Sequence, residues 1–258
     1  MKKTLQFSNI IALIITVVMN YLSNTGIFNG NTMATVSAKY QNSFTPSGYA
    51  FSIWGIIYLG LAAFAIHQSK GLFKKVESPS VVTSIGWLFV ISCAANCAWI
   101  LAWLYDFTGL SVIIMAILLF SLLRIVITTR MELDTVPFKK VALEWWPFSI
   151  YTGWILVAII ANIAAYLTKI NWNGFGISGE SWTIIMICLA AVINLYLIWN
   201  RNMRETALAG AWGITAVAVV NWNEAQSVAY TAVIAAAFLV LNTAVHAYRN
   251  RGNFFILK

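Results

Sequence analysis

The chain has 258 residues, of which 60% are hydrophobic and only 9% are charged. Soluble domains carry about 25% charged residues, so the composition excludes a soluble enzyme, a soluble nucleic-acid binder and a secreted disulfide scaffold. The apolar residues suffice for about eight membrane-spanning helices of ~20 residues each. We therefore predict an all-α polytopic membrane helical bundle. The net charge of +8 is expected to orient the helices in a membrane, and no nucleic-acid partner is expected.

Eight apolar stretches follow one another along the chain. They cover residues 7–22, 48–66, 81–104, 108–127, 146–167, 181–199, 206–220 and 225–247. The first follows Lys2 and Lys3 as in a signal peptide, but no small-x-small cleavage site comes directly after it, so we predict an uncleaved anchor. If the N-terminus lies inside, every Lys and Arg except Lys39 and Lys169 lies on or next to the inner side. This asymmetry predicts that both termini are cytoplasmic, and we expect a bacterial cytoplasmic membrane.

The twelve Trp residues are distributed in two ways. Some lie at the ends of the apolar stretches, where an aromatic belt is expected at the membrane interface: Trp103, Trp145, Trp146, Trp172, Trp182, Trp199 and Trp222. Others lie further inside: Trp54, Trp87, Trp99, Trp154 and Trp212. Anchoring at the interface does not explain the second set, which therefore contains candidates for an internal pocket.

The interior of the predicted spans contains few groups for chemistry. All eight acidic residues lie in loops or at span edges, which disfavours a proton- or sodium-coupled transporter. No nucleophile–base pair is visible, so we assign no catalytic residue and regard an enzyme as the less favoured hypothesis. The three Cys and two His residues do not cluster with the spacing of metal ligands, so we expect no metal site.

The long connection 23–47 is rich in Asn, Thr, Ser and Gly and is predicted to be irregular. Long loops in compact proteins are often functional, so we expect this one to cover a site. The next helix is expected to start after residues 45–48 and to carry Tyr49. Steps of three and four residues then place Phe51, Trp54 and Tyr58 on one helix face.

Two later segments also combine aromatic side chains with polar side chains inside an apolar stretch. Asn96 and Trp99 lie together in the third stretch, and Tyr151, Trp154 and Asn162 lie in the fifth, with small residues on the same face. Aromatic faces beside small residues suit a planar apolar guest. For each Asn the alternative is a hydrogen bond between helices, which is equally compatible with the sequence.

These motifs resemble those of the tryptophan-rich sensory protein (TspO/MBR) family, which includes the mitochondrial translocator protein. TPSGYAFSIWGIIY resembles the Pro-Pro, Phe, Trp and Tyr motif that opens its second helix, ANCAW its Asn-x-x-Trp, and the spacing from Trp154 to Asn162 its fifth-helix motif. Pro46-Ser47 replaces the double Pro, and the Phe51–Trp54 spacing is one residue shorter. The resemblance implies a TspO-like five-helix core over 1–168, followed by three additional transmembrane helices over 169–258.

The resemblance also implies the ligand and the site. We expect a planar hydrophobic small molecule, such as a tetrapyrrole or a sterol, in a sensory or translocator role. No cofactor is required, although a porphyrin- or haem-type ligand fits the family. The expected ligand-binding residues are Tyr49, Phe51, Trp54, Tyr58, Asn96, Trp99, Tyr151, Trp154 and Asn162.

Three other hypotheses stay open at this point. One is an uncoupled transporter or facilitator for a small metabolite, and another is porphyrin breakdown. The third is assembly through the last three helices, where Asn194, Gly210 and Gly213 offer small or polar contact points for a homodimer or for the bundle itself. Membrane lipids are partners under every hypothesis.

Overall fold

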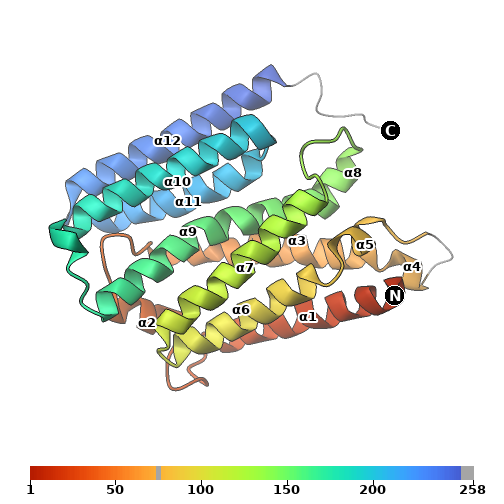
Figure 1. Ribbon diagram of the computed structural model, residues 1–258, viewed down its shortest axis with the longest axis horizontal. Helices are drawn as coiled ribbons and strands as arrows, with labels where there is room; N and C mark the ends of the chain where they lie inside the picture. Colours follow the sequence, from red (N-terminus) through yellow and green to blue (C-terminus); the bar gives the residue numbers. More distant parts are fainter. Residues whose placement is uncertain (74–76, 251–258) are drawn as a thin grey trace.

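The computed structural model describes residues 1–73 and 77–250, and within these ranges the chain forms helices and connections with no strand (Figure 1). Each of the eight predicted stretches contains a long helix, so the prediction of a polytopic helical bundle is confirmed. The corresponding long helices are α1 (Lys2–Leu22), α3 (Ile53–Gln68), α6 (Leu88–Leu104), α7 (Thr108–Thr128), α9 (Trp146–Lys169), α10 (Gly179–Arg201), α11 (Arg204–Asn221) and α12 (Gln226–Arg249).

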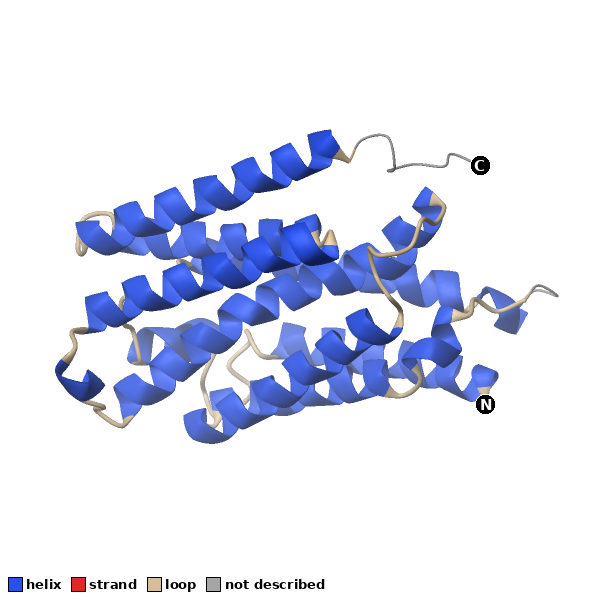
Figure 2. Cartoon of the chain, turned by 45° about the horizontal axis from the view of Figure 1, so that its top comes forward, coloured by secondary structure: helices blue, strands red, loops and turns tan. Residues whose placement is uncertain are grey.

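Six segments within the described ranges are long and apolar enough to cross a membrane: Lys2–Leu22, Gly48–Leu72, Thr108–Thr128, Phe138–Lys169, Gly179–Arg201 and Gln226–Arg249. The helix α6 is apolar but has only 17 residues. The helix α11 begins with the charged pair Arg204 and Glu205 and is buried along most of its length. Both run beside the other helices along the long axis of the bundle (Figures 1 and 2).

The helices form two adjoining cores. In the first, α6 packs on α1 and α7, and α9 packs on α3 and α7; in the second, α10, α11 and α12 pack on one another, and α11 also packs on α9. Val157 of α9 and Phe44 of the 23–47 connection belong to the second core. The division of the chain at residue 168 stays a prediction, although α9 contributes to both cores.

The expected contact points in the last three helices, Asn194, Gly210 and Gly213, pack against other helices of the same chain. A Cβ on Gly210 would lie 2.8 Å from the side-chain amide of Asn194, and one on Gly213 would lie 2.9 Å from Val157. These small residues therefore allow α11 to approach α10 and α9 closely.

The start of α1 and the end of α12 lie at the same end of the bundle (Figure 1), which an even number of crossings requires.

Two local predictions are wrong. The third stretch is not one helix, because Gly86 adopts φ 55° and ends α5 (Val81–Ile85) before α6 begins. The 23–47 connection is not wholly irregular, because it contains the helix α2 (Met33–Lys39). Thr32 caps α2 by accepting from the backbone N–H of Thr35, and the Thr35 hydroxyl accepts from the backbone N–H of Thr32.

The remaining short elements are η1 (Gly48–Ser52), α4 (Lys70–Phe73), α8 (Phe138–Lys140), the π-helical turn η2 (Val141–Trp145) and η3 (Gly174–Gly176). The first of these matters for the site, since η1 is a 3₁₀ turn that leads directly into α3 and carries Tyr49 and Phe51.

Candidate ligand-binding site

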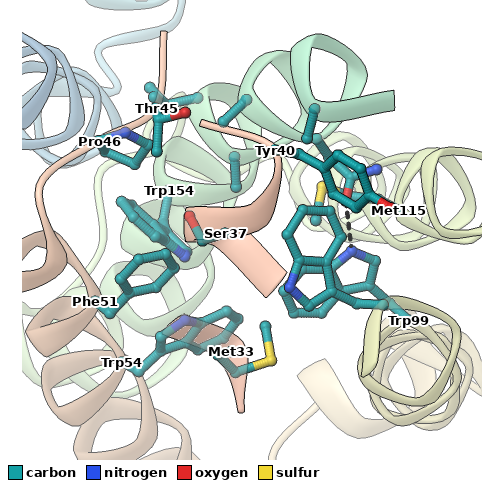
Figure 3. A pocket seen from close by; sticks show the side chains of 16 residues that line it. Met33, Ser37, Tyr40, Thr45, Pro46, Phe51, Trp54, Trp99, Met115 and Trp154 are labelled. Atoms are coloured by element: carbon teal, nitrogen blue, oxygen red, sulfur yellow. Dashed lines mark hydrogen bonds between the residues drawn. The ribbon is translucent and has the colours of Figure 1, made fainter. Parts of the chain in front are cut away.

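Aromatic side chains from three helices converge beneath α2. Phe51 and Trp54 come from η1 and α3, Trp99 comes from α6, and Trp154 comes from α9. Figure 3 shows Phe51, Trp54 and Trp154 on one side of the pocket and Trp99 on the other, with side chains of α2 between them. The predicted convergence of the three segments is therefore present in the structure.

Direct ring contacts organise one wall. The Trp54 ring stacks on Tyr58 at a centroid distance of 5.4 Å and meets Tyr151 and Trp154 edge to face at 5.5 and 6.4 Å. Phe51 meets Trp154 edge to face at 5.9 Å. Such pairs contribute about 0.5–1.5 kcal/mol each beyond the burial of their area, so these rings form a rigid wall.

The buried amides hold the rings from behind. Asn162 Oδ1 accepts from Trp99 Nε1 at 2.9 Å, and Asn162 Nδ2 donates to Ser111 Oγ at 2.9 Å. Asn96 Nδ2 donates to the Tyr151 hydroxyl at 2.8 Å. These contacts link α6 to α7 and α9, so both Asn residues act as hydrogen-bonding links between helices, and Asn162 also lines the pocket.

Three donors in or beside this pocket have no acceptor among the described residues. They are Trp103 Nε1, Trp154 Nε1 and the Tyr58 hydroxyl. Trp103 and Trp154 line the inner part of the pocket, whereas Tyr58 lines its outer part. A buried donor without an acceptor costs about 1–3 kcal/mol, so an acceptor on a guest would be stabilised here.

The pocket has an inner and an outer part. The inner cavity has a volume of about 50 Å³, enough for one or two water molecules only. The outer hollow, between α1, α2 and α3, has about 630 Å³, which lies within the range of small-molecule sites. Both parts are lined by Met33, Ser37, Thr45, Pro46, Phe51, Trp54 and Trp99. A guest in the outer hollow would therefore contact the same rings that close the inner cavity.

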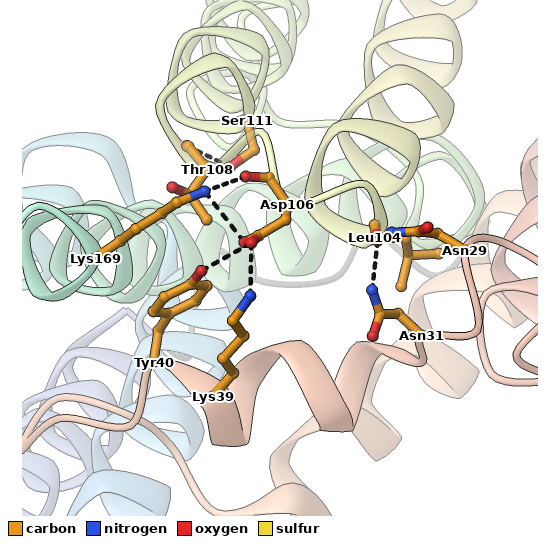
Figure 4. Close-up of polar contacts among 9 residues, drawn as sticks. All are labelled: Asn29, Asn31, Lys39, Tyr40, Leu104, Asp106, Thr108, Ser111 and Lys169. Atoms are coloured by element: carbon orange, nitrogen blue, oxygen red, sulfur yellow. Dashed lines mark hydrogen bonds and ion pairs between the residues drawn. The ribbon is translucent and has the colours of Figure 1, made fainter.

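The roof helix α2 is attached by a cluster of charges around Asp106, in the turn between α6 and α7 (Figure 4). Asp106 Oδ2 accepts from Lys39 Nζ at 2.7 Å and from the Tyr40 hydroxyl at 2.9 Å, and Lys169 Nζ lies 3.3 Å from Asp106 Oδ1. The two Lys residues that did not fit the inner-side pattern thus meet at one carboxylate. Next to them, Asn31 donates to the Leu104 carbonyl at 2.8 Å.

Burial raises the pKa of Asp106, but hydrogen bonds from Lys39, Tyr40 and Lys169 outweigh this effect and hold the pKa below its ordinary value. A carboxylate with a lowered pKa contributes stability above its ordinary pKa and loses that contribution as the pH falls through its folded value. The attachment of α2 therefore persists at neutral pH and is released only in acid.

Replacing Asp106 with Asn is expected to increase amide hydrogen exchange in residues 33–39 severalfold, because both lysines lose their shared anion. Hydrogen exchange measured by mass spectrometry on the full chain in nanodiscs checks this. The matched control is Asp134→Asn, which removes an ion pair with Arg130 at 3.0 Å and should leave α2 unchanged. Equal exchange of α2 in both variants would contradict the attachment.

The second half of the connection is attached to α11. Asn221 Nδ2 donates to the Ser43 carbonyl at 2.9 Å, the Ser47 backbone N–H donates to the Ala216 carbonyl at 3.1 Å, and Trp212 Nε1 donates to the Ala50 carbonyl at 3.0 Å. The roof of the pocket is therefore attached on one side by the first core and on the other by α11.

The predicted site residues separate into three groups. Phe51, Trp54, Trp99, Trp154 and Asn162 line the inner cavity, and Tyr58 lines the outer hollow. Asn96 and Tyr151 line neither part of the pocket, and they are hydrogen-bonded to each other behind the aromatic wall. Tyr49 does not join them, because η1 directs it away from the pocket to an edge-to-face contact with Trp212 at 5.1 Å.

The sequence analysis expected the 23–47 connection to cover a site, but it named no lining residue from it and did not include Trp103 among the site residues. The side chains of Met33, Ser37 and Tyr40 line the cavity from α2, and their steps of four and three residues were the available signal. The prediction that Trp103 belongs to an interfacial belt is wrong, since Trp103 is 6% exposed and lines the cavity one turn after Trp99. The small residues Ala158 and Ala161 line it from α9.

Neither part of the pocket is lined by a charged side chain of the described residues. Over the same ranges, no group of three or more His, Cys, Asp or Glu side chains is arranged to hold a metal ion. The arrangement offers aromatic faces and neutral hydrogen-bonding groups.

These features define an integral membrane protein of the polytopic helical class, with an aromatic pocket beneath the helix α2 of the 23–47 connection. The sequence matches the family described as "TSPO-like protein" over residues 6–245, and the chain belongs to this family. The match extends across α10, α11 and α12 as well as the first five long helices. No curated protein and no solved structure matches the chain.

Proposed function

We propose that this protein binds a planar hydrophobic small molecule, of the tetrapyrrole or sterol type, between the aromatic wall and α2, in a sensory or translocator role. The observation that carries this proposal is the convergence of Phe51, Trp54, Trp99 and Trp154 on a hollow lined by uncharged residues. Flat aromatic faces give a planar guest a large contact area at little conformational cost.

The unpartnered donors support a guest that carries acceptor atoms at its edge. The indole N–H groups of Trp103 and Trp154 and the Tyr58 hydroxyl have no acceptor within the described chain. A carbonyl, hydroxyl or ring nitrogen of the guest would accept from Tyr58 in the outer hollow, and one that reaches the inner cavity would accept from Trp103 or Trp154. A purely hydrocarbon guest would leave them unsatisfied, so we expect oxygen- or nitrogen-containing ring systems to bind more tightly.

A layer of phenylalanines disfavours the alternative of a transporter. Phe64, Phe89 and Phe148, from the same three helices that build the wall, meet edge to face at 4.9–5.6 Å, and each is 0% exposed. Phe64 follows Trp54 by ten residues, which corresponds to about 15 Å along α3. A guest that passed between these three helices would have to part the Phe layer, so binding is favoured over passage.

Replacing Trp54 with Ala is expected to weaken protoporphyrin IX binding about tenfold or more, since Trp54 borders both parts of the pocket and contacts Tyr58, Tyr151 and Trp154. Quenching of protein fluorescence during titration of the detergent-solubilised chain measures the affinity. Trp222→Ala is the matched control, because Trp222 is 52% exposed and contacts Tyr230 away from the pocket.

Unchanged affinity in the Trp54 variant would refute the proposed site. A panel of porphyrins and sterols without any saturable binding to the folded wild-type chain would refute the proposed ligand class. Uptake of the ligand into proteoliposomes, sensitive to Trp54→Ala, would favour the facilitator instead.

A further inference from the structure

A second hollow lies at the opposite end of the bundle from α2. It has a volume of about 730 Å³ and is bordered by the connection 129–137, the π-helical turn η2, the first turns of α11 and the last turns of α12. Figure 1 shows this end, where α8 and the end of α12 lie, far from α2. The hollow shares no lining residue with the aromatic pocket.

Three carboxylates line this second hollow, Glu132, Asp134 and Glu205, and two of them have an oxygen without a partner. Glu132 Oε1 and Glu205 Oε2 are both buried and have no hydrogen-bond partner within the described ranges. His246 also lines the hollow and is 3% exposed, and its Nδ1 likewise has no partner there. Buried polar atoms are normally hydrogen-bonded, and an ionised carboxylate can only accept. A positively charged donor on a guest would satisfy both carboxylate oxygens more strongly than the neutral donor Trp146 Nε1, which also lines the hollow.

The charges around the hollow lead to the same conclusion. Among the described residues that line it, the cation is Arg204, and the third carboxylate, Asp134, is paired with Arg130. Burial, and then the negative charge of Glu205, raise the pKa of Glu132 to about 8, although Arg204 lowers it. Among the described residues, Glu132 and Glu205 thus share the charge of Arg204.

The remaining walls suit an organic cation attached to an apolar chain. Trp145 and Trp146 line the hollow, and indole faces attract ammonium groups. Glu205 and Leu208 also line an apolar groove of about 280 Å³, together with Ile53, Ile56, Ile150, Ala209, Ser52 and Trp212. The groove therefore adjoins the polar hollow at Glu205.

We propose that this end of the bundle binds an amphiphile with a protonated amine head group. The ammonium N–H groups donate to Glu132 and Glu205 beside the two indoles, and the apolar chain lies in the groove along Leu208. The site is independent of the proposed function of the aromatic pocket, and its test uses different ligands and different variants.

The test measures equilibrium binding of radiolabelled dodecylamine to the full chain in phosphatidylcholine nanodiscs. Glu205→Gln and Glu132→Gln are each expected to weaken binding about tenfold, the effect of losing one charge-assisted hydrogen bond. Glu180→Gln is the matched control, because Glu180 accepts from Ser227 at 3.2 Å on the far end of α10 and should bind as wild type. Wild-type affinity in both hollow variants would overturn the proposal.

Two competing ligands test the contributions of the ammonium group and of the apolar chain separately. Dodecanol, with the same chain and no charge, should compete at least about tenfold more weakly than unlabelled dodecylamine, and equal competition would overturn the role of the ammonium group. Butylamine, with the same charge and a short chain, should also compete more weakly than unlabelled dodecylamine. Equal competition would mean that the site takes small water-soluble amines, and it would overturn the proposal that the ligand is an amphiphile.

The pH dependence adds a readout that a structural defect would not produce. Dodecylamine affinity should rise as the pH increases through about 8, because Glu132 ionises there. The other groups facing it are Glu205 and Arg204 of α11, His246 of α12 and Asp134 of its own connection. Glu132→Gln should remove this rise while Glu180→Gln retains it. Should Glu205→Gln fail to fold, Glu132→Gln, on a connecting segment, decides the test alone.

Discussion

Replacing Gly153 with Ala is expected to destabilise the protein by about 3 kcal/mol, through overpacking where α9 meets α11. A Cβ at this position would lie 2.2 Å from the Thr206 carbonyl oxygen and 2.9 Å from the Ala209 Cβ. The first of these atoms belongs to the backbone, so rotation of a side chain cannot relieve the contact. The helix α11 would have to move away from α9 and from the Ser149 carbonyl, to which Thr206 Oγ1 donates at 2.9 Å.

Denaturant unfolding in detergent measures the free energy of unfolding of the Gly153→Ala variant, and Gly55→Ala is the control. Gly55 lies in α3, and no described atom lies within 4 Å of a Cβ added there. The control should be neutral or slightly stabilised, because Ala is preferred to Gly in a helix by about 0.5–1 kcal/mol. If the two variants unfold alike, the close approach of α9 and α11 is not a feature of the folded protein.

Replacing Asn162 with Leu is expected to cost about 1–2 kcal/mol of folding stability, because it removes the acceptor of Trp99 Nε1 and the donor to Ser111 in a buried position. Denaturant unfolding again gives the free energy. The loss should be accompanied by a change in fluorescence, since the Trp99 ring forms part of the pocket wall.

The chain offers a close control for this variant. Asn242 Oδ1 accepts from Trp199 Nε1 at 3.1 Å, the same pair of residue types, but this pair lies on the exposed surface. Asn242→Leu should change stability by no more than about 0.5 kcal/mol. Equal losses in both variants would mean that burial does not set the strength of this hydrogen bond.

The order of the helices and the main aromatic residues were predictable from the sequence because both depend on local pattern. Apolar stretches of sufficient length specify spanning helices in a membrane, where each backbone group must find its hydrogen bond within the segment. The steps from Phe51 to Trp54 and Tyr58, and the recurrence of Trp99 and Trp154, likewise follow from the periodicity of a helix. The family match over residues 6–245 agrees with this interpretation.

The parts of the site that were missed depend on contacts between distant segments. Composition suggested an irregular 23–47 connection, whereas α2 is held in place by Asp106, 67 residues after Lys39. The belt pattern assigned Trp103 to the membrane interface, but packing beneath α2 buries it. No periodicity signals that Glu132, Glu205 and His246 line one hollow, because they lie on three separate segments.

The sequence by itself determined that this is a multi-helix membrane protein with an unusual concentration of internal aromatic residues. Length, low charge and helical spacing are properties of single segments, and the bilayer enforces them on each segment separately. Only the tertiary structure decided which rings face one another, which carboxylates share a hollow, and how α11 supports the roof of the pocket. Those outcomes depend on which helix faces touch, and that is set by the close packing of small residues such as Gly153 and Gly213 against particular neighbours.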